Sequence, residues 1–154
     1  MSSYFALAAW AFAAGALIPV MGTLNAGLAR SLGSAPVAAV VLFAIALAGT
    51  TLVCLLARQS LPDAAAFAAP PRTVYLGGLI VAFYVVSVTL LIPMFGVGNT
   101  IMFAMTAQIV LSAVMDQIGL FGAPLRPVSV IRLIGIALML AGLFLTQFSQ
   151  STSR

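Results

Sequence analysis

Few side chains in this sequence could carry out acid–base or nucleophilic chemistry. It contains two carboxylates, Asp63 and Asp116, one thiol, Cys54, and no histidine, lysine or glutamate. A catalytic site needs a nucleophile with its base, paired acids, or a set of metal ligands. The lack of histidine excludes histidine-based catalytic and zinc sites, and one cysteine gives neither a disulfide framework nor a metal cluster. We therefore expect no enzyme activity and no cofactor or metal.

Polar side chains that could instead bind a solute recur along one apolar stretch, residues 97–118. They fall at every fourth position and so share one helix face, which comprises Thr100, Ala104, Gln108, Ser112 and Asp116. If the stretch lies in a membrane, this face should point into the helix bundle or a cavity, because polar groups are costly in lipid. The alternatives are that Gln108 and Ser112 only join helices by hydrogen bonds, and that Asp116, near one end, is solvated by water or a loop arginine.

Asn25 marks a second polar position, in the stretch nearest the N-terminus. Pro19 cannot donate a hydrogen bond to the carbonyl of Gly15, and Gly22 lets another backbone or a ligand come close. Asn25 lies on the same side, so we predict a kinked helix with a polar point. Alternatively, Asn25 bonds a neighbouring helix and the kink serves packing alone.

Two aromatic residues and a serine complete the set. Tyr84 and Ser87 share a face of a third stretch, and Tyr84 lies near its middle, where its hydroxyl needs a partner. Trp10 could line a cavity or lie in the aromatic belt at the membrane surface. The candidate solute-binding residues are therefore Trp10, Asn25, Tyr84, Ser87, Gln108 and Ser112, and Asp116 is the candidate for proton or ion coupling.

The composition places these residues in a membrane protein. Of 154 residues, 64% are hydrophobic and 5% are charged, whereas soluble domains have roughly 45–50% and about 25%. Six basic and two acidic side chains cannot cover the surface of a soluble domain of this size. The net charge of +4 comes from scattered arginines rather than a basic stripe, which excludes a nucleic-acid binder.

Five apolar stretches have the length of about 17–25 residues that a membrane-spanning helix needs. They cover residues 4–29, 35–57, 74–93, 97–118 and 128–147. Because they lack the alternating polarity of barrel strands, we predict an all-α integral membrane protein, a five-helix bundle that forms one membrane domain over residues 1–154. The first stretch is expected to be a retained helix, since no basic side chain precedes it as in a signal peptide.

The connections between these stretches are short, with one exception. Residues 58–73 form a longer link, and its alanine-rich piece predicts a short interfacial helix before Pro70 and Pro71. We expect Pro93 to end the third helix. On the fifth helix, Gly135 and Gly142 share a face that could let another helix approach closely.

The distribution of arginines gives only a weak indication of how the chain is oriented in the membrane. With five spans, the side that holds the N-terminus carries Arg58, Arg72, Arg126 and Arg132, and the other side carries Arg30 and Arg154. Cytoplasmic loops collect arginine, so the first side should be cytoplasmic. Because the bias is small, two interpretations stay open: one fixed orientation, or insertion in both orientations to give antiparallel dimers.

The sequence resembles the drug/metabolite transporter superfamily, and within it the YdcZ-like five-helix family, over nearly its whole length. The motifs that carry the resemblance are Gly15-Ala-Leu-Ile-Pro19, Leu24-Asn25-Ala26, Gly77-Gly78-Leu79, Phe83-Tyr84-Val85, Pro93-Met-Phe-Gly96, Ala107-Gln108-Ile109, and Asp116-Gln117-Ile118-Gly119 followed by Gly122. Their order and spacing are more specific than any single motif.

The resemblance implies a small-molecule transporter in the bacterial inner membrane, related to ten-helix transporters built from two inverted five-helix halves. One chain here matches one half, so the resemblance implies an antiparallel homodimer that works by alternating access. The smallest exporters of the superfamily exchange cations for protons at a glutamate in their first helix, which has no acid in this sequence. An accessory or assembly subunit of another membrane protein is the alternative function.

Overall fold

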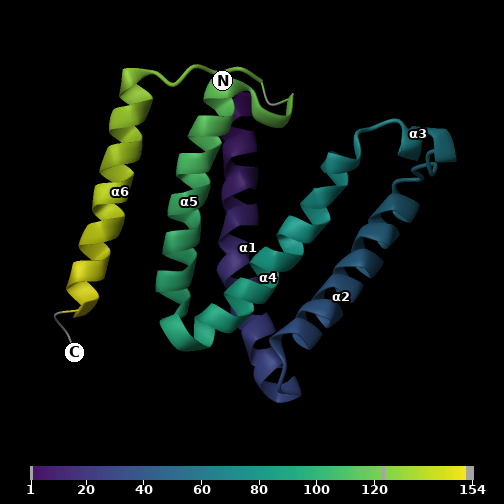
Figure 1. Ribbon diagram of the computed structural model, residues 1–154, viewed down its shortest axis with the longest axis horizontal. Helices are drawn as coiled ribbons and strands as arrows, with labels where there is room; N and C mark the ends of the chain where they lie inside the picture. Colours follow the sequence, from purple (N-terminus) through teal and green to yellow (C-terminus); the bar gives the residue numbers. More distant parts are fainter. Residues whose placement is uncertain (1, 123, 152–154) are drawn as a thin grey trace. The chain divides into compact units, whose positions relative to one another are not determined.

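A computed structural model describes residues 2–122 and 124–151, and every regular element in them is a helix (Figure 1). The main helices are α1 (Ser2–Leu32), α2 (Ala35–Leu56), α4 (Leu76–Phe95), α5 (Val97–Ile118) and α6 (Val130–Ser151). Three shorter elements lie between them: α3 (Ala64–Ala68) and the 3₁₀ turns η1 (Arg72–Tyr75) and η2 (Leu120–Gly122). The predicted all-α fold is confirmed.

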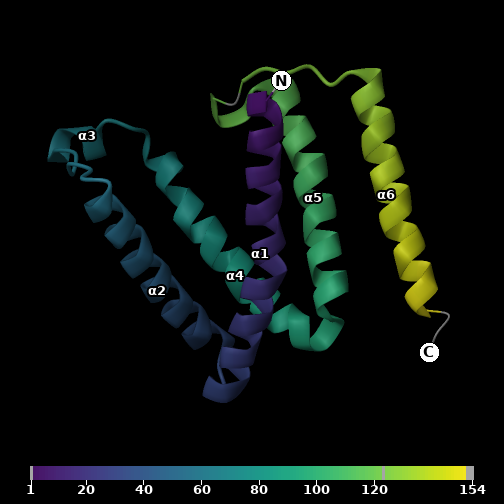
Figure 2. The same cartoon turned by 180° about the vertical axis from the view of Figure 1, so that it is seen from behind.

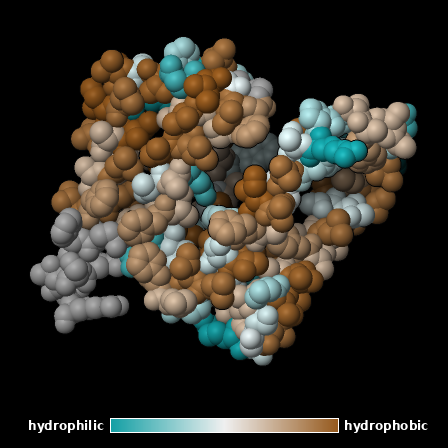
Figure 3. Space-filling model, in the orientation of Figure 1, coloured by the Kyte–Doolittle hydropathy of each residue, from teal (hydrophilic) through white to brown (hydrophobic). Residues whose placement is uncertain are grey.

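Four helical segments are long and apolar enough to cross a membrane. They are Tyr4–Leu32, Ala35–Leu56, Arg72–Phe95 and Val97–Ile118. Within α6, the corresponding apolar segment is the shorter Val130–Thr146. The surface is that of a protein surrounded by lipid, because large apolar side chains are exposed along all of these helices (Figure 3).

Local signals set the ends of the predicted elements. The Ser34 hydroxyl accepts a hydrogen bond from the Val37 backbone N–H at 3.4 Å and begins α2, after Gly33 has turned the chain at a φ of 69°. In the same way, the Asp63 carboxylate accepts from Ala66 N–H at 2.8 Å and begins α3. The short helix predicted within the 58–73 link is confirmed.

The prediction that Pro93 ends the third spanning helix was wrong. Helix α4 continues through Pro93 to Phe95 and ends at Gly96, whose φ is 86°. A proline so close to the end of a helix removes a single backbone hydrogen bond. The helix stops where Gly96 adopts the left-handed conformation and donates its N–H to the Ile92 carbonyl at 3.0 Å.

The chain divides into two compact units, Met1–Val97 and Gly98–Arg154, called here the N-terminal unit and the C-terminal unit. In the N-terminal unit α1 packs against α2 and α4, and α2 also contacts α4 (Figures 1 and 2). The centre of this packing contains Ala26, Val88 and Ile92, all buried. In contrast, every residue of α1 from Tyr4 to Leu17 is exposed, so the helices of this unit pack over part of their length only.

Candidate functional site

Asn25 forms a buried polar contact between α1 and α4. Its side-chain amide donates a hydrogen bond to the Thr89 hydroxyl at 2.7 Å, and that hydroxyl donates to the Val85 carbonyl at 2.7 Å. Both side chains are almost fully buried, at 4% and 2% exposed. Asn25 was predicted to bind a solute or to bond a neighbouring helix, and the structure places it in the second kind of contact. Thr89 was missed, because nothing in the local sequence marks a partner 64 residues away.

Gly22 explains how α1 and α4 approach closely at this point. A Cβ atom built on Gly22 would lie 2.8 Å from Cδ1 of Ile92 and 3.2 Å from Cγ1 of Val88. These distances are shorter than ordinary van der Waals contact, so a side chain at position 22 would displace α4 side chains. Gly22 was predicted to let another backbone or a ligand come close, and what comes close is a pair of apolar side chains of α4.

Tyr84, Ser87 and Trp10 occupy three different environments in the N-terminal unit. Tyr84 is half-buried against the Ala26–Val88–Ile92 cluster, and no described residue hydrogen-bonds its hydroxyl. Ser87 is half-buried and is the one polar side chain lining an open hollow of about 770 Å³ on α4. Trp10 is 75% exposed and lies in the N-terminal half of α1, where every residue from Tyr4 to Leu17 is exposed.

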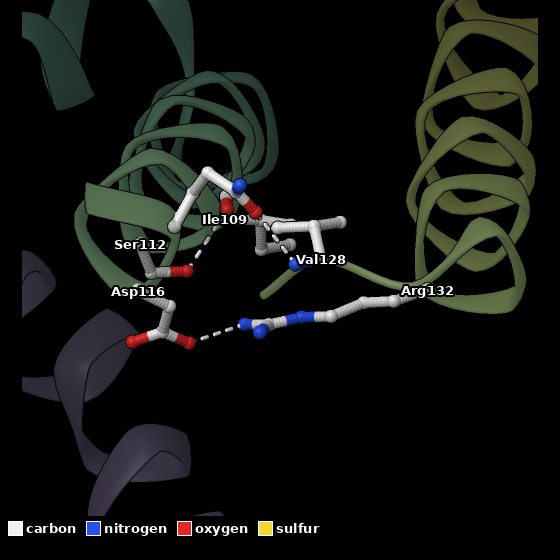
Figure 4. Close-up of polar contacts among 6 residues, drawn as sticks. Ile109, Ser112, Asp116, Val128 and Arg132 are labelled. Carbon is white, nitrogen blue, oxygen red and sulfur yellow. Dashed lines mark hydrogen bonds and ion pairs between the residues drawn. The ribbon is translucent and has the colours of Figure 1, made fainter. Parts of the chain in front are cut away.

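The predicted polar face of α5 divides into a buried and an exposed part. Thr100 is buried, whereas Gln108 and Ser112 are exposed. The Ser112 hydroxyl donates to the Ile109 carbonyl of its own helix at 2.8 Å (Figure 4). The Gln108 carboxamide makes no hydrogen bond with the part of the chain that is described. A single chain therefore leaves Gln108 unenclosed.

Asp116 is paired with Arg132, which reaches from the first turn of α6 to the last turns of α5 (Figure 4). The distance between Arg132 Nη2 and Asp116 Oδ2 is 2.6 Å, and the two side chains are 37% and 30% exposed. A loop arginine had been considered as a means of solvating Asp116, whereas the arginine that pairs with it lies in the first turn of α6. Because the pair is partly exposed, its attraction is screened and contributes modestly to stability.

Two further hydrogen bonds hold the link between α5 and α6 against the end of α5. The Arg126 backbone N–H donates to the Asp116 carbonyl at 2.9 Å, and the Val128 N–H donates to Gln117 Oε1 at 2.7 Å. Near the other end of α6, the Thr146 hydroxyl contacts the Met102 sulfur at 3.3 Å. The role of Gln117 was not predicted, although it directly follows Asp116.

In the described residues there is no group of three or more histidine, cysteine, aspartate or glutamate side chains that could hold a metal ion. Cys54 is a free, exposed thiol. In the described residues, the polar groups form hydrogen bonds and the Asp116–Arg132 ion pair within and between largely apolar helices.

Comparison with the models of known protein families gives a match. Residues 6–145 match the family model described as "Putative inner membrane exporter, YdcZ". No curated protein and no solved structure matches the chain. The family match agrees with the apolar helices described above and with the resemblance in the motifs around Pro19, Tyr84 and Gln108. This chain is a multi-pass inner membrane protein that belongs to the YdcZ-type exporter family of drug/metabolite transporters.

Proposed function

We propose that the protein moves a small molecule across the inner membrane by alternating access, along a path that two copies of the chain enclose together. The observation that carries the proposal is the exposure of Gln108 in a membrane-spanning helix, with no partner for its carboxamide among the described residues. Such a group is costly in lipid, so it needs water, a solute or a second protein surface. A transport path supplies all three.

The proposal includes five spans, with α6 as the fifth. The apolar segment of α6, Val130–Thr146, has 17 residues, at the short end of the range of about 17–25 that spans a bilayer. Five spans would make one chain a single membrane domain equivalent to half of a ten-helix transporter. In transporters with inverted repeats, the solute site lies near the midplane between the halves.

The second copy would run antiparallel to the first. The arginine distribution of four against two gives little preference for one orientation. On α6, a Cβ at Gly135 or Gly142 would meet no atom of another described segment within 4 Å, so the described part of the chain leaves this predicted contact face open. Small residues on an open face favour close approach of another helix. We therefore assign the dimer contact to the Gly135–Gly142 face.

Among the candidate residues, Tyr84 and Gln108 are the main solute ligands in this proposal. Both carry polar atoms that no described residue engages. Trp10, Ser87 and Ser112 would line the path. Asn25 already donates to Thr89, so its role would be to fix α1 against α4. Asp116, paired with Arg132, would tune transport rather than act as its only driver.

A flux assay tests the role of Gln108. Proteoliposomes containing the purified protein are screened with a panel of labelled cations, anions and neutral solutes. For any solute transported, Gln108→Leu should lower the rate about tenfold, the size of a lost hydrogen bond. Thr50→Val is the matched control, because the Thr50 hydroxyl already donates within its own helix, to Ala46 O at 2.9 Å.

Equal rates for Gln108→Leu and the wild type would contradict the assignment of Gln108. If instead the wild type moves no solute of the panel and co-purifies with another membrane protein, the accessory-subunit alternative replaces transport.

Cysteine labelling tests the antiparallel dimer. A single cysteine replaces Ser60 in the exposed α2–α3 link of a Cys54→Ala background, and intact cells are treated with an impermeant thiol reagent. Insertion in both orientations should give labelling that saturates near half and becomes complete after permeabilisation. Labelling that stays near zero in intact cells, or is complete in them, would contradict dual insertion.

A further inference from the structure

The C-terminal unit contains an apolar groove between α5 and α6. Its volume is about 490 Å³, within the usual range of about 300–1,000 Å³ for small-ligand pockets. The walls include Val114 and Ile118 from α5 and Leu133 and Ile136 from α6. The one polar lining residue is Gln117, whose side-chain oxygen already accepts from Val128 N–H. The groove therefore suits an apolar occupant.

One end of the groove is positively charged. Three of the lining residues lie close in sequence to charged residues. Gln117 follows Asp116, Leu133 follows Arg132, and Val128 lies two residues after Arg126. Arg126 and Arg132 both bond to Asp116, through a backbone N–H and a guanidinium N–H respectively. Two arginines against one aspartate leave a net positive charge. The first turn of α6 adds the positive end of the helix dipole.

We propose that this groove binds one acyl chain of an anionic phospholipid, whose phosphate lies at Arg126 and Arg132. The Arg126 side chain is exposed, and Arg132 uses one guanidinium N–H on Asp116, so both have donors for a phosphate. Basic pockets between membrane helices bind anionic headgroups in this way. The proposal goes beyond transport and does not depend on it.

Charge complementarity favours a lipid over a second copy of the chain as the occupant. Each chain carries only two acidic residues. Asp116 is already paired with Arg132, and the Asp63 carboxylate caps α3. A second copy therefore has only Asp63, which caps α3 through one oxygen, as a carboxylate outside an ion pair among its described residues. An anionic phospholipid carries the required charge directly beside an apolar chain.

The α4 hollow provides a matched control within the same molecule. It is larger, at about 770 Å³, and also apolar. No charged residue lines either surface, but no arginine lies within two residues of those that line the hollow. Both surfaces can accept lipid chains by contact alone. Only the groove between α5 and α6 should distinguish an anionic from a zwitterionic headgroup.

Native mass spectrometry of the detergent-solubilised protein tests the proposal. Phosphatidylglycerol and phosphatidylcholine with identical acyl chains are titrated in parallel. The wild type should prefer phosphatidylglycerol, and Arg126→Gln should weaken its binding about fivefold while leaving phosphatidylcholine binding unchanged. Arg126 lies in an exposed link and bonds to Asp116 through its backbone, so the substitution leaves the fold intact. Leu133→Trp, which fills the groove, should remove the preference, and Leu90→Trp in the α4 hollow should retain it.

Equal binding of the two lipids by the wild type would overturn the proposal. A preference that persists in both Arg126→Gln and Leu133→Trp would also overturn it, because the site would then lie elsewhere. Disulfide cross-linking between copies through cysteines at Leu133, undiminished by phosphatidylglycerol, would identify a second copy as the occupant instead. Because all readouts are binding or cross-linking, a failure of the transport assay does not affect this test.

Discussion

The α1–α4 contact of the N-terminal unit and the α5–α6 pair of the C-terminal unit are both joined by polar contacts, yet only the first has a packed core. Around Asn25 and Thr89, the residues Ala26, Val88 and Ile92 are buried. Beside the Asp116–Arg132 pair, the space between α5 and α6 is a groove of about 490 Å³.

The difference lies in the small residues rather than in the polar contacts. A Cβ at Gly22 would meet Ile92 and Val88 of α4, whereas a Cβ at Gly135 or Gly142 of α6 would meet no atom of another described segment within 4 Å. In lipid, helices associate through close van der Waals packing, since there is no hydrophobic driving force between them. A polar contact fixes the ends of two helices, but a small residue must meet a complementary side chain before the helices pack.

The largest effect is expected where this packing is tightest. Gly22→Leu should lower the free energy of unfolding by about 3 kcal/mol, because the new side chain overlaps Ile92 and Val88. Gly15→Leu is the control, since Gly15 lies in the same helix and has nothing within 4 Å. Unfolding in detergent mixtures measures both, and equal losses would show that Gly22 has no special role in helix packing.

A smaller effect is expected from the buried polar contact. A double-mutant cycle of Asn25→Leu and Thr89→Val should give a coupling of about 1 kcal/mol, within the range of interhelical hydrogen bonds in membranes. The same unfolding assay measures it. A coupling of zero would mean that the Asn25–Thr89 hydrogen bond contributes nothing to the α1–α4 contact. Asn25 would then again be a candidate solute ligand.

The partly exposed ion pair should contribute less. The cycle of Asp116→Asn and Arg132→Gln should give a coupling of about 0.5 kcal/mol that falls as salt is raised. In the flux assay, Asp116→Asn should leave most of the gradient-driven transport. Loss of gradient-driven transport with solute exchange retained would instead identify Asp116 as the proton carrier.

The smallest effect on the fold is expected at the open face of α6. Gly142→Leu should change the free energy of unfolding of the single chain by less than about 0.5 kcal/mol, because no described atom lies near it. If the proposed dimer uses this face, the same substitution should reduce chemical cross-linking between copies, while Ala141→Leu should not. A marked loss of stability in the single chain would show that α6 packs on its own chain there.

The helices could be predicted from the sequence where local signals set them. Residues 97–118 were predicted as a span and are α5, and the start of α2 at residue 35 follows from Gly33, Ser34 and Pro36. Each of these signals acts through neighbours within one helical turn. The end of α4 was missed because a proline was given more weight than Gly96, whose positive φ stops the helix.

The partners of the polar residues could not be predicted. Asn25 was identified as a polar point near Gly22, but its partner Thr89 lies 64 residues away and no pattern links the two. Arg132 was counted among the arginines on one side of the membrane, without its bond to Asp116. Helix length and caps are local properties, whereas the choice of partner depends on which helix faces meet.

The contact between Asn25 and Thr89 also sets an order of events during synthesis. Thr89 leaves the ribosome 64 residues after Asn25, which takes about 3–13 s at about 5–20 residues per second. Through that interval, the Asn25 amide has no α4 to bond. Helix α2 is synthesised in the meantime, and its Ala35, Ala38 and Ala39 are buried in the final packing. Membrane insertion of α1 must therefore tolerate an unpaired amide until α4 arrives. Because polar groups are costly in lipid, this favours keeping α1 beside water or the insertion machinery until then.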